Sequence, residues 1–269
     1  MSYFHPKRRF GQNFLKSGAI IDKIVERLAP QKGERVIEVG PGKGDLTIAI
    51  AKTGADLLAI EIDRELMGHL ERRFREKPNV QILQRDILTV DPDILNFGEF
   101  ALVGNLPFNI SSPMIEWIVQ YRSHITRAVL MFQKEVAHRI AAKPGGKDWS
   151  PLSIFTQLYF DITVAFDVLP KHFTPEPEVS ASVIVLQPKP EVKVPHPTLF
   201  EHLVRGSFRQ RRKLLLNNLV PDYISDLTVG RAIVSRLNMG PHCRAEELST
   251  EQFIELTEMV ASFSSESDN

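Results

Sequence analysis

The segment Asn105-Leu106-Pro107-Phe108 combines a neutral amide, a proline-restrained backbone and an aromatic ring. The Asn105 side-chain oxygen and the Leu106 carbonyl can each accept a hydrogen bond from an amine, and Pro107 restricts the backbone at that carbonyl. Phe108 offers a flat apolar surface on which a base can stack. The alternative is a plain turn, because proline and asparagine are common in turns.

These groups suit one difficult reaction, methylation of the exocyclic amine of adenine. The lone pair of that amine is delocalised into the ring, and two well-placed acceptors favour the pyramidal nitrogen on which the lone pair is free. A sulfonium methyl donor is already a strong electrophile, so alignment matters more than a strong base. We therefore predict that Asn105, Leu106, Pro107 and Phe108 are catalytic and act on an unstacked base.

A second signal is the glycine loop Glu38-Val39-Gly40-Pro41-Gly42-Lys43-Gly44, which lies between a predicted strand and a predicted helix. Its spacing differs from the G-x-G-x-x-G of dinucleotide dehydrogenases, and the chain has no G-x-x-x-x-G-K-[ST] phosphate loop. Glu61 ends the next predicted strand, where an acid can bind ribose hydroxyls, and Asp86 follows the third. Together they predict a site for an adenosine cofactor without a triphosphate, although a structural turn and a loop aspartate are the alternatives.

Apolar runs that alternate with helix-like segments position these residues. The predicted strands are 35–39, 57–61, 80–84, 100–104, 128–132, 159–168 and 183–186. The predicted helices among them include 20–28, 45–52, 63–75 and 113–121. Such alternation indicates an α/β fold with a parallel sheet, whose ligand site lies beyond the carboxyl ends of the strands.

A proline-rich stretch near residue 190 separates this pattern from a helical remainder, so we predict domains at 1–190 and 191–269. The single cysteine, Cys243, excludes an internal disulfide, and the histidines have no metal-ligand spacing, so no metal is expected. No apolar stretch is long enough to cross a bilayer, and the basic N-terminus lacks the apolar core of a secretory signal. We expect a cytoplasmic protein, working as a monomer without a membrane partner.

The charge balance is regional. The whole chain has 33 basic and 33 acidic residues, but the acids Glu246, Glu247, Glu251, Glu255, Glu258, Glu266 and Asp268 follow the last basic residue, Arg244. Two basic clusters lie in the remainder, and each suits a phosphate backbone unless it is an ordinary solvated surface. Their members are Lys7, Arg8 and Arg9 near the N-terminus, and Arg205, Arg209, Arg211, Arg212 and Lys213 in the helical remainder.

Several motifs in register resemble the ribosomal RNA adenine dimethyltransferase family. They are Gly11-Gln12-Asn13-Phe14-Leu15, the glycine loop, Asn105-Leu106-Pro107-Phe108, Gln133-Lys134-Glu135-Val136, Phe173-Thr174-Pro175 and Phe208-x-Gln210-Arg211-Arg212-Lys213. The resemblance implies a Rossmann-like class I S-adenosylmethionine methyltransferase domain with a smaller C-terminal helical domain. It also implies dimethylation of N6 on two adjacent adenosines in the 3′-terminal hairpin loop of 16S rRNA, within a pre-30S particle, during late small-subunit assembly.

The resemblance also assigns residues. Cofactor contacts are expected at Gln12, Asn13, Leu15, Gly40, Gly42, Glu61, Ile62, Asp86, Ile87 and Asn105. RNA contacts are expected at the two basic clusters and at Phe173, which offers a second stacking ring. The chain departs from the family pattern at Phe108, where tyrosine is usual, at Glu178 and Ala181, where lysine and serine are usual, and at Trp149 in place of tyrosine.

Three other functions use part of the same pattern. A nicotinamide dehydrogenase would share the sheet, but the glycine spacing and the Asn-Leu-Pro-Phe corner argue against it. A large-subunit rRNA adenine methyltransferase would share fold and chemistry, although the 208–213 segment favours the small-subunit branch. A non-catalytic RNA-binding assembly factor would predict that Asn105 can be replaced without loss of function.

Overall fold

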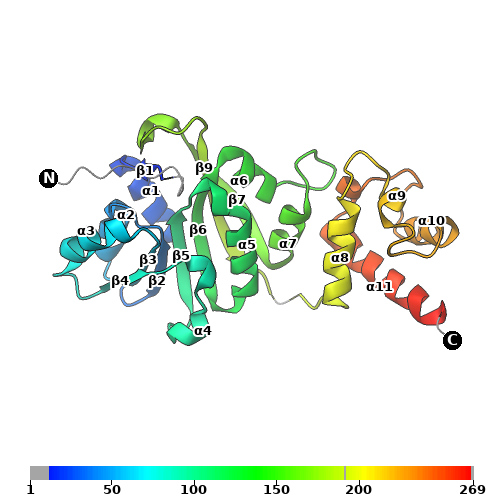
Figure 1. Ribbon diagram of the computed structural model, residues 1–269, viewed down its shortest axis with the longest axis horizontal. Helices are drawn as coiled ribbons and strands as arrows, with labels where there is room; N and C mark the ends of the chain where they lie inside the picture. Colours follow the sequence, from blue (N-terminus) through cyan, green and yellow to red (C-terminus); the bar gives the residue numbers. More distant parts are fainter. Residues whose placement is uncertain (1–11, 191, 268–269) are drawn as a thin grey trace. The chain divides into compact units, whose positions relative to one another are not determined.

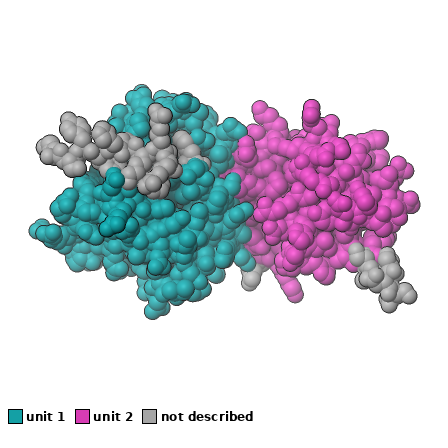
Figure 2. Space-filling model, viewed as in Figure 1, with its two compact units in different colours: residues 1–138, 160–188 teal, residues 139–159, 189–269 magenta. Residues whose placement is uncertain are grey.

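The computed structural model describes residues 12–190 and 192–267, and these form two compact units (Figure 2). Unit 1 comprises the described residues up to His138 together with Phe160–Pro188. Unit 2 comprises Arg139–Tyr159 together with the described residues from Lys189 onward. Each unit has its own apolar core, and each is described by itself.

Unit 1 is built on a seven-stranded sheet in the order β4-β3-β2-β5-β6-β9-β7 (Figure 1). The strands are β2 (Arg35–Val39), β3 (Asp56–Glu61), β4 (Val80–Gln84), β5 (Phe100–Asn105), β6 (Ile125–Gln133), β7 (Phe160–Val168) and β9 (Ala181–Pro188). The strands from β4 to β6 in this order are parallel to their neighbours. Their carboxyl ends therefore lie at one edge of the sheet, as the strand and helix alternation predicts.

The sheet is mixed, and in this respect the expectation of a parallel sheet is wrong. Strand β9 pairs antiparallel with both β6 and β7. Between β7 and β9 the chain forms only a short 3-10 turn and the two-residue strand β8 (Phe173–Thr174). A parallel strand would need a longer crossover to return to the starting edge, so this short connection favours the antiparallel arrangement.

The helices of this part of the chain cover the sheet. They are α1 (Gly18–Leu28), α2 (Asp45–Ala51), α3 (Arg64–Phe74), α4 (Pro92–Leu95), α5 (Ser111–Gln120) and α6 (Lys134–Ile140). Apolar residues of α1 and α2 pack in one cluster with Val36, Val103 and Val129 of the strands. The alternate strand residues Ile37 and Leu102 are also fully buried, so both faces of the sheet are covered.

Unit 2 is a helical assembly around one apolar core. Its helices are α7 (Pro151–Tyr159), α8 (Pro197–Ser207), α9 (Leu215–Leu219), α10 (Leu227–Arg236) and α11 (Thr250–Ser267). Trp149 lies in this core, and its indole Nε1 donates a hydrogen bond to the Leu248 carbonyl at 2.8 Å. Within the described ranges, no helix is both long and apolar enough to span a membrane.

The segment 139–159 belongs to unit 2, although the sequence pattern places it in the first domain. Trp149, Ile154 and Leu158 supply the reason, because their side chains pack into the core of the C-terminal helices. The proline-rich stretch marks only one of the crossings between the units. That 1–190 and 191–269 are the domains of this protein stays a prediction.

Candidate cofactor and adenine site

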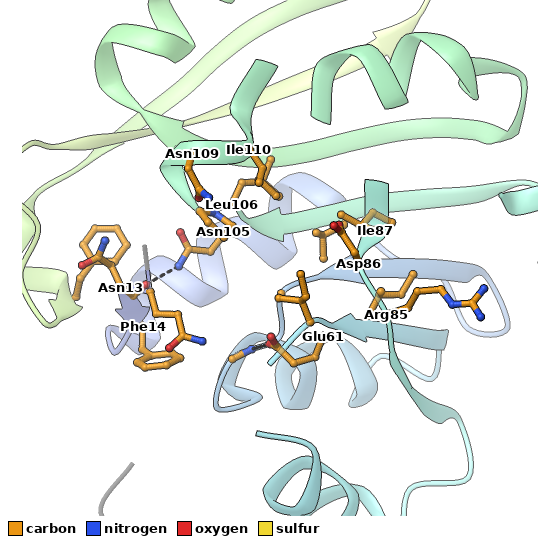
Figure 3. A pocket seen from close by; sticks show the side chains of 18 residues that line it. Asn13, Phe14, Glu61, Arg85, Asp86, Ile87, Asn105, Leu106, Asn109 and Ile110 are labelled. Atoms are coloured by element: carbon orange, nitrogen blue, oxygen red, sulfur yellow. Dashed lines mark hydrogen bonds between the residues drawn. The ribbon is translucent and has the colours of Figure 1, made fainter. Parts of the chain in front are cut away.

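A cavity of about 280 Å³ lies in unit 1, and the loops that follow β2, β3, β4 and β5 line it (Figure 3). Most of the predicted cofactor residues meet there. They are Gln12, Asn13, Gly40, Gly42, Glu61, Ile62, Asp86, Ile87 and Asn105. Leu15 is the exception, because its side chain packs into the apolar core against α1 and α2.

The glycine loop approaches the cavity with a backbone that only glycine adopts readily. Gly40 and Gly42 have φ values of 66° and 58°, in the left-handed region. A Cβ atom on Gly42 would lie 2.8 Å from the Cδ1 atom of Phe14, so a side chain there would displace the N-terminal segment. The loop thus stays close to strand β1 (Phe14–Leu15) and leaves room in the cavity.

Glu61 is buried at the end of β3, and the backbone holds its carboxylate. The Gly42 N–H donates to Oε2 at 3.1 Å, and the Asp63 N–H donates to Oε1 at 2.9 Å. Burial raises the pKa of Glu61 above its usual range, whereas these two hydrogen bonds oppose that rise. Each oxygen retains further acceptor capacity, which ribose hydroxyls can use.

Asp86 and two isoleucines form the neighbouring wall. One oxygen of Asp86 accepts a hydrogen bond from the Leu88 N–H at 3.0 Å and so caps the short turn that follows. Ile87 is buried, whereas Ile62 is 44% exposed, which is unusual for a large apolar side chain that lines a cavity. An apolar ring system bound there would cover Ile62 and leave the second Asp86 oxygen as an acceptor.

The side chain of Asn105 has a defined orientation. Its Nδ2 donates a hydrogen bond to the backbone carbonyl of Asn13 at 2.8 Å (Figure 3). A carbonyl can only accept, so the amide nitrogen must face Asn13 and the side-chain oxygen is left for another donor. The predicted catalytic role requires this oxygen as an acceptor.

The backbone groups of Leu106 and Pro107, the next residues of the predicted catalytic corner 105–108, are also oriented by hydrogen bonds. The Leu106 N–H donates to the Met131 carbonyl at 3.2 Å, and none of the described residues donates to the Leu106 carbonyl. The Pro107 carbonyl accepts from the Ile110 N–H at 3.2 Å, which closes the turn. Leu106 and Pro107 line the cavity, and the side chain of Phe108 lies outside what the structure describes.

Phe173 lies in a different environment from the one expected of an RNA-contacting surface residue. Its side chain is 1% exposed and packs in the core of unit 1, and it also borders the cavity. It sits on β8, which pairs antiparallel with β1 so that Leu15 lies opposite Phe173. A base can meet this ring only from within the cavity.

Sequence reasoning missed several residues of the site. Phe14, Val39, Ile60, Arg85, Asn109 and Ile110 also line the cavity. The position of Arg85 directly after β4, and of Asn109 a few residues after β5, could have identified them, because ligands bind beyond the carboxyl ends of parallel strands. Among the described residues, no group of histidine, cysteine, aspartate and glutamate could hold a metal ion.

Glu38 is a further ionisable group beside the site, and it faces away from solvent. It is 1% exposed, and its Oε2 has no hydrogen-bond partner among the described residues. Burial raises the pKa of Glu38 to about 8, and the charges of Glu61 and Asp45 act in the same direction. The side chain is therefore protonated at neutral pH.

The predicted RNA-binding cations of unit 2 differ in how far other protein groups already bind them. Arg205 pairs with Glu201 and Arg209 pairs with Asp222, each at 2.9 Å.

Arg211 binds the protein itself, because it donates to the carbonyls of Lys147 and Trp149. Arg212 and Lys213 are exposed and have no ion pair with any described residue. Lys7, Arg8 and Arg9 lie outside the described residues.

Comparison with known proteins gives a consistent result. The profile of the family described as "Ribosomal RNA adenine dimethylase" matches residues 3–262. Proteins named "Ribosomal RNA small subunit methyltransferase A" are similar over most of their length. The one from Pseudomonas fluorescens is 37% identical over 95% of this chain and 93% of the relative. The one from Latilactobacillus sakei is 39% identical over 96% and 90%.

Two solved structures share the fold. A dimethyladenosine transferase from Plasmodium falciparum has a TM-score of 0.76 at 26% identity, covering 90% of this chain and 95% of that one. The 23S rRNA methyltransferase ErmE has a TM-score of 0.73 at 25% identity, covering 93% and 100%. The profile and the relatives show that the chain belongs to the ribosomal RNA adenine dimethylase family.

Proposed function

We propose that this protein methylates the N6 amines of two adjacent adenosines in the 3′-terminal hairpin loop of 16S rRNA, twice each, with S-adenosylmethionine as methyl donor. The substrate is a pre-30S particle late in small-subunit assembly. The orientation of Asn105 carries the proposal, because its side-chain oxygen is left as an acceptor at the cavity. Relatives named for small-subunit methylation support the choice of RNA.

The cavity fits the cofactor chemically. Glu61 and Asp86 provide acceptors for ribose hydroxyls and for an adenine amino group, and Ile62 and Ile87 provide apolar contact with a ring. Such an acidic lining suits a cofactor with a positive sulfonium better than a triphosphate. Bound there, S-adenosylmethionine supplies an activated methyl group.

The chain's own residues prepare the amine. Before the first transfer, Asn105 Oδ1 and the Leu106 carbonyl accept hydrogen bonds from the two N6 hydrogens, which directs the nitrogen lone pair away from the ring. Held there, the cofactor would supply its methyl group to N6 and leave as S-adenosylhomocysteine, and the methylated amine would give up one proton to solvent. Phe173 borders the place where the base must lie, so it can contact the ring edge or face inside the cavity.

Arg212 and Lys213 are the RNA contacts that unit 2 supports best, since both are exposed and without an ion pair to a described residue. We also propose that the protein acts as a monomer in the cytoplasm. Size-exclusion chromatography with light scattering would test the monomer, and a stable dimer would contradict it.

The substrate is tested by incubating the protein with labelled S-adenosylmethionine and three RNAs. These are undermethylated small subunits, naked small-subunit RNA and large-subunit RNA. We expect label on the two adjacent adenosines of the small-subunit hairpin loop. Label only in large-subunit RNA would contradict the proposed substrate. It would instead favour methylation of 23S rRNA, the activity for which ErmE is named.

A further inference from the structure

Asp63 connects three parts of the site, although no motif identifies it. Its side chain is 1% exposed and lies directly after β3. One carboxylate oxygen accepts from the Glu65 N–H at 3.1 Å and caps α3, and the other accepts from Gln12 Nε2 at 3.0 Å. Its own N–H donates to Glu61 Oε1 at 2.9 Å. Asp63 therefore links helix α3, the acid Glu61 and the N-terminal segment.

The N-terminal segment 12–16 also reaches the opposite side of the cavity. The carbonyl of Asn13 accepts from Asn105 Nδ2 at 2.8 Å, and the Lys16 N–H donates to the His172 carbonyl at 2.9 Å. Strand β1 within this segment pairs with β8, which carries Phe173. One short segment thus contacts both the cofactor acid, through Asp63, and the amide of the catalytic corner.

We propose that Asp63 is a positioning residue that, through Gln12, couples the cofactor side of the cavity to the catalytic corner. The inference rests on the proposed function and changes the role expected of Gln12. The Gln12 amide binds Asp63, so its contribution to cofactor binding is to hold the segment in place. The contacts that hold the end of β3 thereby also keep the Asn13 carbonyl against Asn105.

If Asp63 only capped helix α3, it would not need its second carboxylate oxygen. The second oxygen therefore separates a capping role from the proposed positioning role. Serine is a good cap residue but has one side-chain oxygen, so Asp63→Ser keeps the cap of α3 and removes the contact with Gln12. Asparagine can keep both contacts if the Gln12 amide rotates, because its oxygen caps the helix and its NH₂ donates to Gln12. Gln12→Ala removes the contact from the other side.

The first measurement is the affinity for S-adenosylhomocysteine by calorimetry. We expect Asp63→Ser and Gln12→Ala each to weaken binding about five- to tenfold, as for loss of one ordinary hydrogen bond. The double variant should be no weaker than the worse single variant, because both changes remove one contact. Asp63→Asn should stay within about twofold of the unmodified protein.

The matched control is Asp91→Ser, the same exchange at the residue that caps α4 through the Asp93 N–H at 2.9 Å. It should leave the affinity unchanged. A second measurement is hydrogen exchange at the Lys16 amide, which is protected by its hydrogen bond to the His172 carbonyl as long as the segment stays in place. We expect exchange to accelerate several-fold in Asp63→Ser and Gln12→Ala, and not in Asp91→Ser.

The outcomes separate this inference from the proposed function. If the unmodified protein binds the cofactor product and methylates small-subunit RNA, but Asp63→Ser matches it in affinity and exchange, the coupling is wrong. The coupling would also be wrong if the losses of S-adenosylhomocysteine affinity in the two single variants multiplied in the double variant. If the unmodified protein neither binds the product nor methylates RNA, the proposed function itself fails.

Discussion

The cavity of unit 1 and the basic segment 205–213 of unit 2 use their polar side chains in opposite ways. In the cavity, Glu61, Asp86 and Asn105 lie at or just after the ends of three strands that are separated in the sequence. Protein hydrogen bonds fix the orientation of each side chain and leave it able to accept a further hydrogen bond. In the basic segment, five cations lie within nine positions, yet Arg205 and Arg209 are already paired with acids. We therefore expect the hydrogen-bonding or charge capacity that is left over after folding to identify a binding group better than proximity in the chain does.

The substitution Asn105→Ala tests this comparison with the largest expected effect. We expect kcat for RNA methylation to fall by about 10²- to 10³-fold, as for removal of one group that stabilises a transition state. Affinity for S-adenosylhomocysteine should change much less. The control is Asn109→Ala, an exposed amide that lines the same cavity and should cost only a few-fold. Equal losses in the two variants would show that amide orientation is irrelevant.

The second prediction concerns Glu38, the acid beside the cavity that keeps its proton. Its pKa is about 8 in the folded chain and near the usual 4.5 when unfolded, so the unfolded chain binds fewer protons between these values. The contribution of Glu38 to the free energy of unfolding must then fall as the pH rises from 4.5 to about 8, and level off above that. Glu38→Gln should remove this slope and be more stable than the unmodified protein at pH 8 by roughly 2–4 kcal/mol.

Urea unfolding across this pH range measures the difference, and Glu34 provides a control of opposite sign. Glu34 pairs with Arg127 at 2.6 Å, and that hydrogen bond lowers the pKa of Glu34. Its contribution to stability is present above its unfolded pKa and is lost as the pH falls through the folded value. Glu34→Gln should therefore destabilise the protein at neutral pH. A parallel response of both variants would contradict the assignment for Glu38.

A smaller effect is expected from Glu61→Gln on cofactor affinity. A glutamine would place an NH₂ group against the N–H of either Gly42 or Asp63, and one of the two hydrogen bonds would be lost. We expect S-adenosylhomocysteine to bind about ten- to thirtyfold more weakly, measured by calorimetry. Glu71→Gln, an exposed acid on α3, should leave binding unchanged. Unaltered affinity in Glu61→Gln would remove Glu61 from the cofactor site.

The smallest effect tests the basic segment. Replacing Arg212 and Lys213 with glutamine should weaken RNA binding about tenfold and reduce the salt dependence by about two counterions. Replacing Arg205 and Arg209 should change the salt dependence less, because their acid partners already neutralise them. Binding titrations at several salt concentrations compare the two double variants. Identical slopes would mean that pairing within the protein does not decide which cations contact RNA.

Much of the site follows from local patterns in the sequence. Apolar runs and helix-like segments predict the parallel part of the sheet, and parallel strands bring their carboxyl ends to one edge. Glycines, Glu61, Asp86 and Asn105 therefore meet in the structure as predicted, and family motifs identify the N-terminal residues that join them. These features are predictable because strand periodicity and turn residues act over a few positions.

Other features depend on which distant groups meet, and no local pattern contains that information. The Asn105 amide is oriented by a carbonyl 92 positions away, Phe173 is buried by pairing with the N-terminal segment, and Trp149 joins the C-terminal helices. The sequence by itself determined the kind of fold and the edge of the sheet at which the predicted site residues meet. The tertiary structure alone decided which polar atoms remain available there, because that depends on partners that only folding brings into contact.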